Sequence, residues 1–383
     1  MASPQARAGR YLTIIITVSL IAYCASFYLP LTSKAKNNIF YIGVSLPTAI
    51  CLMLNLKETL YIIKTYIWVF LSIAALSTLF ASDTKDLKAA LYLSLLFFSL
   101  KIICSNEHRA WRNPIILYSL LSTALFIHFT VQWFMEGVDQ ELWERYSFFL
   151  GHYINPVYTC TLITSSLCSL WLFLIEPHTS ARSKAVHFLS IGLLVGAVLL
   201  CTVMFQSRST LLGFSMFLAA YALLRRQWSL ILGMAAITLI AFIIGDIWEV
   251  LLERGLSYRP EIWKDAISRV VDVCGILTGC GSDGHQFAGQ WPHAHSAYVS
   301  TFYRAGLLGI LFLTIFLCFT GWHASRRYSL WLPIAVIGWG SVITTTYGVI
   351  SSPDQSFWVY FWIPTFLAIL DQTAWRPTPR SQY

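Results

Sequence analysis

A succession of long apolar segments constrains the fold of this 383-residue chain more than any other feature. Each segment has roughly 17–24 residues, and a helix of about 20 apolar residues crosses the hydrocarbon core of a membrane. In lipid, only helices and closed barrels satisfy all their backbone polar groups. The sequence therefore predicts an all-α polytopic membrane protein with about 12 transmembrane helices. They are centred near Val18, Pro47, Phe70, Leu95, Ala124, Ser165, Val195, Phe217, Ile237, Thr314, Val336 and Thr365.

The composition and the placement of charge agree with this class. The chain is 57% hydrophobic and 11% charged, whereas a soluble domain has about 25% charged residues. With a cytoplasmic N-terminus, 15 of the 26 Lys and Arg residues fall in inner loops and tails and 6 in short outer loops. The positive-inside rule then predicts a multi-pass membrane protein with both termini in the cytoplasm. The basic balance reflects topology, so membrane lipids are expected partners and nucleic acid is not.

One connection is much longer than the others. We expect residues 1–383 to form a single integral-membrane domain, with residues 247–296 as a large periplasmic loop between predicted spans 9 and 10. Pro260 and Glu261 suit the first turn of a helix. The residues that follow predict an amphipathic helix, lying at the membrane surface or capping the bundle. Its apolar face would comprise Trp263, Ala266, Ile267, Val270, Val271 and Cys274.

The two cysteines of this loop leave two alternatives open. Cys274 and Cys280 would face an oxidising compartment, which permits a disulfide bond. Two unpaired thiols are the other interpretation.

His295 opens the apolar run that follows the loop. Gly306 and Gly309 lie about three and four helical turns further on, so a regular helix starting at His295 would place all three on one closely packed face. That face would aim the imidazole into the mouth of the bundle. A capping histidine bound to a loop carbonyl is the alternative. A metal site from His285, His293 and His295 lacks a recognisable ligand spacing, and we expect no metal.

Arg208 and Arg145 lie in predicted outer connections. Arginine at a membrane boundary is costly unless it meets an anion or carbonyl groups, so Arg208 is a candidate anion ligand. The alternative is an arginine that reaches lipid phosphates. Arg145 is a candidate third anion contact, or else a solvated charge that offsets Glu141 and Glu144.

Arg259 immediately precedes the predicted loop helix. A guanidinium beside a helix N-terminus combines a planar set of donors with the positive end of the helix dipole, which suits a phosphate or diphosphate. The alternative is a surface ion pair with Glu261 or Asp265, which stabilises little.

Several motifs are missing from the chain. Its outer loops contain no D-x-D, no G-x-G-x-x-G and no P-loop, and its inner loops are too short to build a nucleotide site. Any chemistry at the outer face would therefore use a donor that arrives there already activated, such as a polyprenyl-diphosphate sugar, and no cofactor is expected.

The motifs together resemble those of the bacterial O-antigen ligase superfamily, which includes O-antigen polymerases and protein O-oligosaccharyltransferases. The resemblance covers the chain from about Arg145 to the C-terminus. It is carried by His295-Ser296 with Gly306-x-x-Gly309, Ser257-x-Arg259-x-Glu261-x-Trp263, Gly279-Cys280-Gly281, Gln206-Ser207-Arg208-Ser209, and Arg145 with Asn155-Pro156. Cys280 departs from the pattern, because relatives more often have an apolar residue there.

The resemblance implies a GT-C-like glycosyltransferase with a periplasmic active site. It would transfer an undecaprenyl-diphosphate-linked glycan to a hydroxyl of lipid A-core with inversion and without metal. His295 would be the general base, and Arg208, Arg259 and Arg145 would bind the diphosphate. A polymerase or a protein-glycosylating enzyme would use the same chemistry. A transporter or flippase is an alternative of another class, but its ionisable residues would lie near the midplane of the membrane.

Overall fold

The computed structural model describes residues 4–80, 84–106, 112–140, 144–180, 183–227, 258–281, 283–345 and 348–371. Within these ranges the chain is almost entirely helical, and the sheet found there is a hairpin of two short strands. The apolar segment centred on Ile237 and residues 247–257 of the predicted loop lie outside the described residues.

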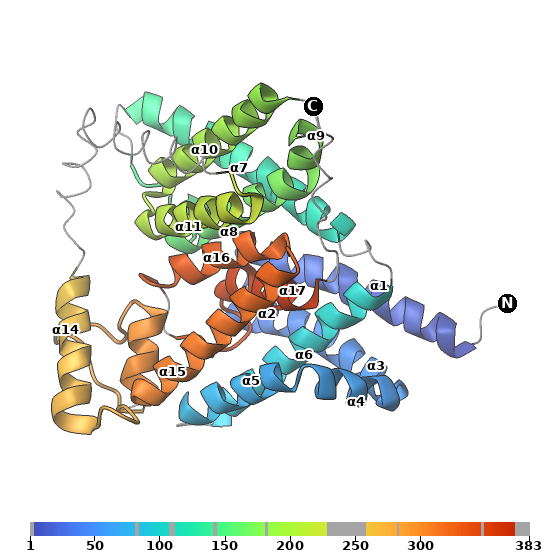
Figure 1. The fold of residues 1–383 in the computed structure, drawn as a ribbon. Coiled ribbons are helices and arrows are strands. Elements are labelled where there is room, and N and C mark those ends of the chain that lie inside the picture. Colours follow the sequence, from blue (N-terminus) through green and yellow to red (C-terminus); the bar gives the residue numbers. More distant parts are fainter. Residues whose placement is uncertain are drawn as a thin grey trace.

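The described helices follow one another along the chain, and most of the connections described between them are short (Figure 1). The described elements are α1 (Pro4–Ala25), α2 (Ser33–Phe40), α3 (Leu46–Leu54), α4 (Leu56–Thr65), α5 (Ile67–Phe80), α6 (Thr84–Asn106), α7 (Arg112–Gln140), β1 (Phe148–Phe149), β2 (His152–Tyr153), α8 (Pro156–Leu170), α9 (Glu176–Ser180), α10 (Lys184–Phe205), α11 (Arg208–Arg225), α14 (Arg259–Arg269), α15 (Ala297–Arg326), α16 (Trp331–Ser341) and α17 (Ile363–Leu370). A 3₁₀ turn covers Ser26–Tyr28, and π-helical turns cover Tyr41–Ser45, Trp171–Ile175, Val270–Cys274 and Trp358–Trp362.

Seven of the described helices are long and apolar enough to cross a membrane. An eighth span is possible in the pair Leu56–Thr65 and Ile67–Leu79, which is bent by 75°. All the predicted segment centres that fall on described residues lie inside helices. The all-α, multi-helix membrane class is therefore confirmed, whereas the number of twelve spans stays a prediction.

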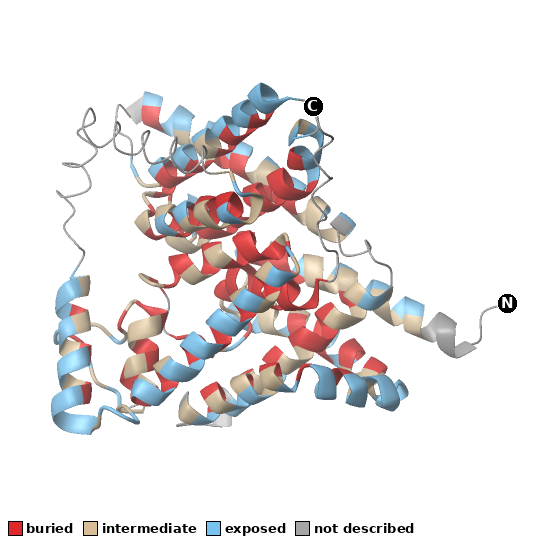
Figure 2. Cartoon of the chain, in the orientation of Figure 1, coloured by how far each residue is buried: buried red, intermediate tan, exposed pale blue. Residues whose placement is uncertain are grey.

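Burial follows the pattern of a membrane bundle (Figure 2). Large aromatic side chains, among them Trp358 and Trp362, fill the interior. Leucines on the outer faces of the helices, such as Leu71, Leu193 and Leu311, are exposed. In lipid these exposed apolar faces are solvated by acyl chains, so their exposure is compatible with a stable fold.

Glycines allow α11 and α16 to pack closely. A Cβ atom added at Gly213 would lie 2.4 Å from the carbonyl oxygen of Ile337, and one added at Gly340 would lie 2.9 Å from the Cα of Gly213. Such small residues let the backbones of membrane helices approach one another. The contact fixes α11, which carries Arg208 at its first position, against the centre of the bundle.

Four helix ends meet on one side of the bundle, which we call the site end. They are the end of α7, the start of α8, the end of α10 and the start of α11. Helices α7, α10 and α11 all pack on α8, which brings these ends together. The connection between α7 and α8 bonds to the last turn of α10, since the amide of Tyr146 donates to the carbonyl of Met204 at 3.0 Å.

The predicted loop helix is present as α14, which lies beside α15 (Figure 1). Its predicted apolar face is only partly right. Ala266 and Val270 are buried as expected, but Ile262 joins them, and Ile267 and Val271 are exposed. The reason is that α14 packs on α15 and on the loop rather than on a flat surface, so only a narrow i, i+4 stripe is covered. Cys274 and Cys280 form a disulfide bond.

Candidate functional site

Arg145 lies in an extended segment against the end of α10. Its Nε donates a hydrogen bond to the carbonyl oxygen of Phe205 at 2.9 Å. Such a bond satisfies one of the last four carbonyl groups of α10, which have no partner within the helix. The side chain is therefore fixed at the site end rather than extended into solvent, and a solvated loop charge is not what the structure contains.

Arg208 begins α11 after a tight two-residue connection. Gln206 adopts a left-handed conformation with φ of 49°, and the amide of Ser207 donates to the carbonyl of Thr202 at 3.1 Å. The hydroxyl groups of Ser207 and Thr210 lie 2.7 Å apart in the interior. This turn reverses the chain within two residues, so Arg208 and Arg145 both lie next to the end of α10.

Arg259 begins α14, after Tyr258 in a left-handed conformation. Burial lowers the pKa of the Arg259 guanidinium, and the positive charges of Arg208 and Arg145 lower it further. Arginine stays protonated in spite of such shifts. Arg208 and Arg145, which belong to two other segments, are thus among the charges that act on Arg259.

His295 lies on the loop, two residues before α15. Its φ of 50° is left-handed, a conformation that costs most non-glycine residues free energy. Helix α15 starts at Ala297, and the hydroxyl of Ser296 caps it by accepting from the amide of Val299 at 3.3 Å. His295 is therefore neither helical nor the cap itself.

Aromatic groups hold the His295 ring. The ring centroid lies 3.9 Å from that of His293 and 5.4 Å from that of Trp291. The Nε1 of Trp263, on α14, donates to the carbonyl oxygen of Ala294 at 2.9 Å. This bond ties the histidine segment to the helix that Arg259 begins.

Burial lowers the pKa of the His295 imidazole, and the charge of Arg259 lowers it further. Both causes favour the neutral ring, which can accept a proton. His293 is affected more strongly, because burial and the neighbouring His295 lower its pKa to about 4. The structure thus holds Arg145 and Arg208 next to the end of α10, and it ties the segment of His295 to the helix that Arg259 begins.

The expected geometry of the glycine motif is wrong. Gly306 has φ of 60° and ψ of −155° and breaks α15, so it does not share a regular helical face with His295. The break docks the disulfide loop: the amide of Leu307 donates to the carbonyl of Ile276 at 2.8 Å. A Cβ atom at Gly306 would lie 2.4 Å from the carbonyl carbon of Leu277, so only glycine fits there.

A polar network completes the loop around the histidines. Asp283 accepts from Arg269 Nε at 2.9 Å and from the Tyr303 hydroxyl at 2.7 Å. Asp265 accepts from the amide of Ala288 at 2.7 Å and lies 3.0 Å from His285 Nε2. These bonds join α14, the loop and α15, so the segment has a fixed shape despite its length.

A recess of about 130 Å³ adjoins His293 on the side of this network. It is lined by polar and aromatic residues, among them Asp283, His285, Ser300 and Arg304. The Ser300 hydroxyl is buried and has no hydrogen-bond partner among the described residues. The recess can therefore offer several donors and acceptors to a small polar group.

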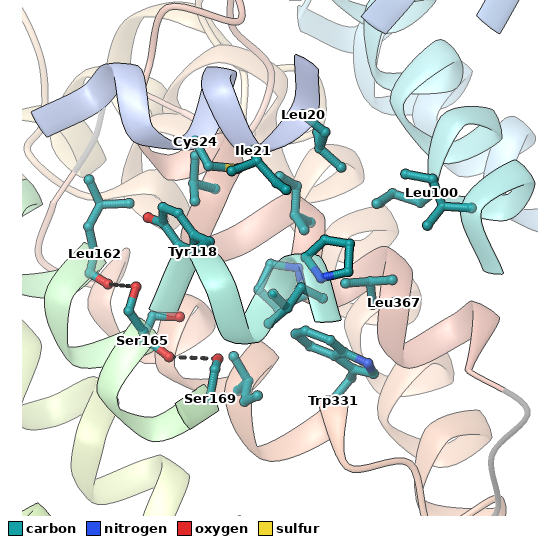
Figure 3. Close-up of a pocket in the computed structure, with 18 of the residues that line it drawn as sticks. Leu20, Ile21, Cys24, Leu100, Tyr118, Leu162, Ser165, Ser169, Trp331 and Leu367 are labelled. Atoms are coloured by element: carbon teal, nitrogen blue, oxygen red, sulfur yellow. Dashed lines mark hydrogen bonds between the residues drawn. The ribbon is translucent and has the colours of Figure 1, made fainter. Parts of the chain in front are cut away.

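The bundle also contains an apolar cavity of about 80 Å³ between α1, α7, α8 and the C-terminal helices (Figure 3). Its wall includes Tyr118, Leu162 and Trp331. The hydroxyl of Ser169, which also lines the cavity, donates to the carbonyl of Ser165 at 2.8 Å and is therefore satisfied within α8. None of the four predicted site residues lines the cavity, and it offers no chemistry of its own.

Among the described residues, the group that resembles a metal site consists of Cys274, Cys280 and Asp283. Because the two sulfurs are joined in a disulfide bond, they provide no thiolate ligand.

Sequence reasoning did not identify Trp291 as a site residue. Trp291 precedes His295 by four residues and pairs with Phe287 in a small bridge, with N–O distances of 2.7 and 2.9 Å. The sequence signal was present in Trp291 itself and in Trp263, because large aromatic residues in a polar loop need a packing partner.

No family model, no curated protein and no solved structure matches this chain.

Proposed function

We propose that the protein is an O-antigen ligase, a GT-C-like glycosyltransferase of the bacterial inner membrane. It transfers an undecaprenyl-diphosphate-linked O-polysaccharide to lipid A-core, with inversion and without a metal ion. In this proposal the chain has twelve spans, both termini are cytoplasmic, and the site end faces the periplasm.

One juxtaposition carries the proposal: Arg145 and Arg208 lie next to the end of α10 and act on Arg259, whose helix is bonded to the segment of His295. Positive side chains that converge in a partly buried place concentrate the field there and attract an anion. A diphosphate supplies compensating charge, and arginine binds its oxygens with two parallel donors. The arrangement therefore favours a dianionic group at the arginines and a base beside it.

The proposed step is a direct displacement. His295 accepts the proton of the acceptor hydroxyl, and the oxygen forms a bond to the anomeric carbon of the donor. The bond from that carbon to the diphosphate oxygen breaks, and the diphosphate leaves with the electron pair. His295, now protonated, releases its proton to solvent after the product departs. A lowered pKa suits this role, because the imidazole is neutral when the acceptor arrives.

The arginines would act on the leaving group. Negative charge grows on the diphosphate as its bond to the sugar breaks, and fixed cations that are already in place stabilise this charge without reorganisation. Arg145 is held by the Phe205 carbonyl, and Arg208 and Arg259 each occupy the first position of a helix. Their positions therefore depend on the backbone and do not require the ligand to assemble them.

The polar recess gives the acceptor a place in this scheme. It is lined by His293, whose ring contacts that of His295. A glycan with several hydroxyl groups can bond to Asp283, Ser300 and Arg304 there. An acceptor bound in the recess would thus lie close to the proposed base, while the inverting displacement requires its hydroxyl to attack the anomeric carbon opposite the leaving diphosphate.

An O-antigen polymerase or a protein O-oligosaccharyltransferase would use the same step with another acceptor. Deletion of the gene distinguishes them: loss of a ligase leaves long polymer on the lipid carrier, loss of a polymerase leaves a single repeat on lipid A-core, and loss of a protein-directed enzyme leaves lipopolysaccharide intact. A transporter is favoured less, because the site residues gather at one end of the helices.

The direct test is transfer by the purified protein in nanodiscs, with donor lipid and lipid A-core, without ATP and with a metal chelator. We expect wild type and His152→Ala, which changes an exposed histidine on β2, to be active. His295→Ala should lower the rate by about 10²–10⁴-fold. Full activity of a folded His295→Ala protein would remove the base assigned here, and inactivity of the wild type would contradict the proposed reaction.

A further inference from the structure

The disulfide loop carries a second apolar surface that the packing of α14 does not cover. We call this surface the loop tip. It comprises Val271, Val273, Ile276 and Leu277, whose exposed fractions are 54%, 67%, 46% and 60%. The buried stripe of α14, by contrast, consists of Ile262, Ala266 and Val270, which pack with Phe287, Ala294 and Tyr303. The loop tip is therefore a separate surface and not the outer part of that small core.

The loop tip is continuous with the outer face of a membrane helix. The amide of Leu307 donates to the carbonyl of Ile276 at 2.8 Å, and the amide of Leu308 donates to that of Leu277 at 3.2 Å. Leu307 and Leu308 are exposed, and so are further apolar residues along α15, namely Leu311, Phe312 and Ile315. Helix α15 is one of the helices able to span a membrane, so the apolar surface runs from its lipid-facing side onto the loop.

The backbone of the loop is partly paired. The amides of Gly275 and Gly279 donate to the carbonyls of Val270 and Gly275, at 3.0 and 2.8 Å, and the amide of Cys280 donates to the carbonyl of Tyr303 at 2.7 Å. The carbonyls of Ile276 and Leu277 are paired at the break in α15, whereas their amides donate to no backbone carbonyl of the described residues. Such a segment suits the boundary between headgroups and acyl chains, where polar groups still meet its amides, and not the centre of the bilayer.

We propose that the loop tip inserts into the lipid bilayer beside the break in α15 and contacts acyl chains of the leaflet at the site end. The insertion is shallow, because Asp272 is exposed between Val271 and Val273 and has to remain at the level of the headgroups. Interfacial segments of this type enter the boundary between headgroups and chains by about 5–10 Å.

The insertion would fix the height of the site above the membrane. Helix α14 begins at Arg259 and runs directly into the turn Val270–Cys274. An anchor at one end of this continuous element determines how far the other end lies from the headgroups. The inference concerns only the contact with lipid, and it holds whether or not the protein transfers a glycan.

Photo-crosslinking of the full-length protein tests the proposal. A photoreactive phenylalanine derivative replaces Val273, and the protein is reconstituted in vesicles of phosphatidylethanolamine and phosphatidylglycerol with isotope-labelled acyl chains. Leu311 on α15 is the positive control site, and Lys264, exposed on α14, is the negative one. We expect labelled lipid on the peptide containing residue 273 in at least about tenfold excess over residue 264.

The outcomes separate the alternatives. Lipid adducts at residue 311 without adducts at residue 273 would overturn the proposal, and so would equal labelling at residues 264 and 273. Adducts between two copies of the chain at residue 273 would instead identify the loop tip as a protein interface. The exposed substitutions Val271→Asp and Leu277→Asp together should lower labelling at residue 273 and leave that at residue 311 unchanged.

Discussion

Helix α11 carries an arginine at each end, and the two arginines have opposite surroundings. Arg208, at the site end, joins Arg145 in placing positive charge on Arg259. Arg225, at the other end, forms an ion pair with Glu176, and the two side chains are only 5% and 2% exposed. Arginines from separate segments thus influence one another at one end of the helix, whereas a pair of opposite charges closes the other end.

The end of α11 at Arg225, which we call the neutral end, belongs to a network of polar side chains formed by Glu176, His187, Tyr221 and Arg225. The Tyr221 hydroxyl donates to Glu176 Oε1 at 3.3 Å and lies 3.3 Å from His187 Nε2, while the Arg225 guanidinium lies 5.6 Å from the centre of the Tyr221 ring. These contacts join α9, α10 and α11. The comparison indicates that buried charge at this end holds helices together, whereas the charge at the site end is where the proposed function places an anionic ligand.

The largest expected effect comes from breaking the neutral end. Arg225→Met leaves the Glu176 carboxylate buried without its cation, which should lower the free energy of unfolding by about 3–5 kcal/mol. The double variant Glu176→Leu/Arg225→Met removes both charges and should recover most of this loss. Thermal unfolding in detergent measures both, with Arg226→Gln as the control for an exposed arginine one position further along the chain. Equal stability of the single and double variants would contradict the role assigned to this pair.

The next effect comes from removing charge at the site end. Arg259→Gln should lower the transfer rate by about 10²–10³-fold, as expected when one fixed donor to a developing charge is lost. Its unfolding temperature should stay the same or rise, because the repulsion from Arg145 and Arg208 is relieved. This is the opposite pattern to that of Arg225→Met. Loss of stability without loss of transfer would make Arg259 a structural residue.

A smaller effect is expected at the break in α15. Gly306→Ala places a side chain where the carbonyl carbon of Leu277 would be 2.4 Å away, in a backbone conformation that glycine tolerates best. Strain of this kind costs on the order of 1–3 kcal/mol. Hydrogen exchange should speed up at the amides of Leu307 and Leu308, which bond to the disulfide loop. The amides of α11 should exchange at their original rate.

The smallest effect is a shift in pH dependence. Burial and Arg259 lower the pKa of His295, so the neutral base persists as pH falls through the usual histidine value of about 6.5. The transfer rate of the wild type should therefore fall only below that value. In Arg259→Gln one of the two causes is removed, and the midpoint of the residual activity should move upward. An unchanged midpoint would argue against an electrostatic effect of Arg259 on the pKa of His295.

The lowered pKa of His295 also determines how its contribution to folding stability changes with pH. A histidine whose pKa is lower in the folded state binds fewer protons there than in the unfolded chain. His295 therefore favours unfolding as the pH drops below the unfolded value, and it makes no such contribution at neutral pH.

Much of the helical content could be predicted from the sequence, because apolar runs of membrane length have few other solutions. The break at Gly306 could not. A glycine pair in an apolar run is equally compatible with close packing of a regular helix, and only the docked loop at Ile276 and Leu277 determines that the helix opens.

The site residues were predicted individually, but the arrangement around them was not. Arg145, Arg208, Arg259 and His295 come from four segments, and nothing in their spacing indicates that Trp263 bonds to the Ala294 carbonyl. The pair of Glu176 and Arg225 was missed for the same reason. The two residues lie 49 positions apart, and Arg225 alone resembles any basic residue of a short inner loop.

The length of α11 adds a mechanical consequence. Its 18 residues span about 27 Å at the usual rise of an α-helix, close to the ~30 Å of a bilayer interior. One unbroken helix therefore joins the site end to the pair of Glu176 and Arg225. A tilt of α11 at the paired end would be transmitted along the helix to Arg208, so the pair sets the position of the other end as well as the stability of its own.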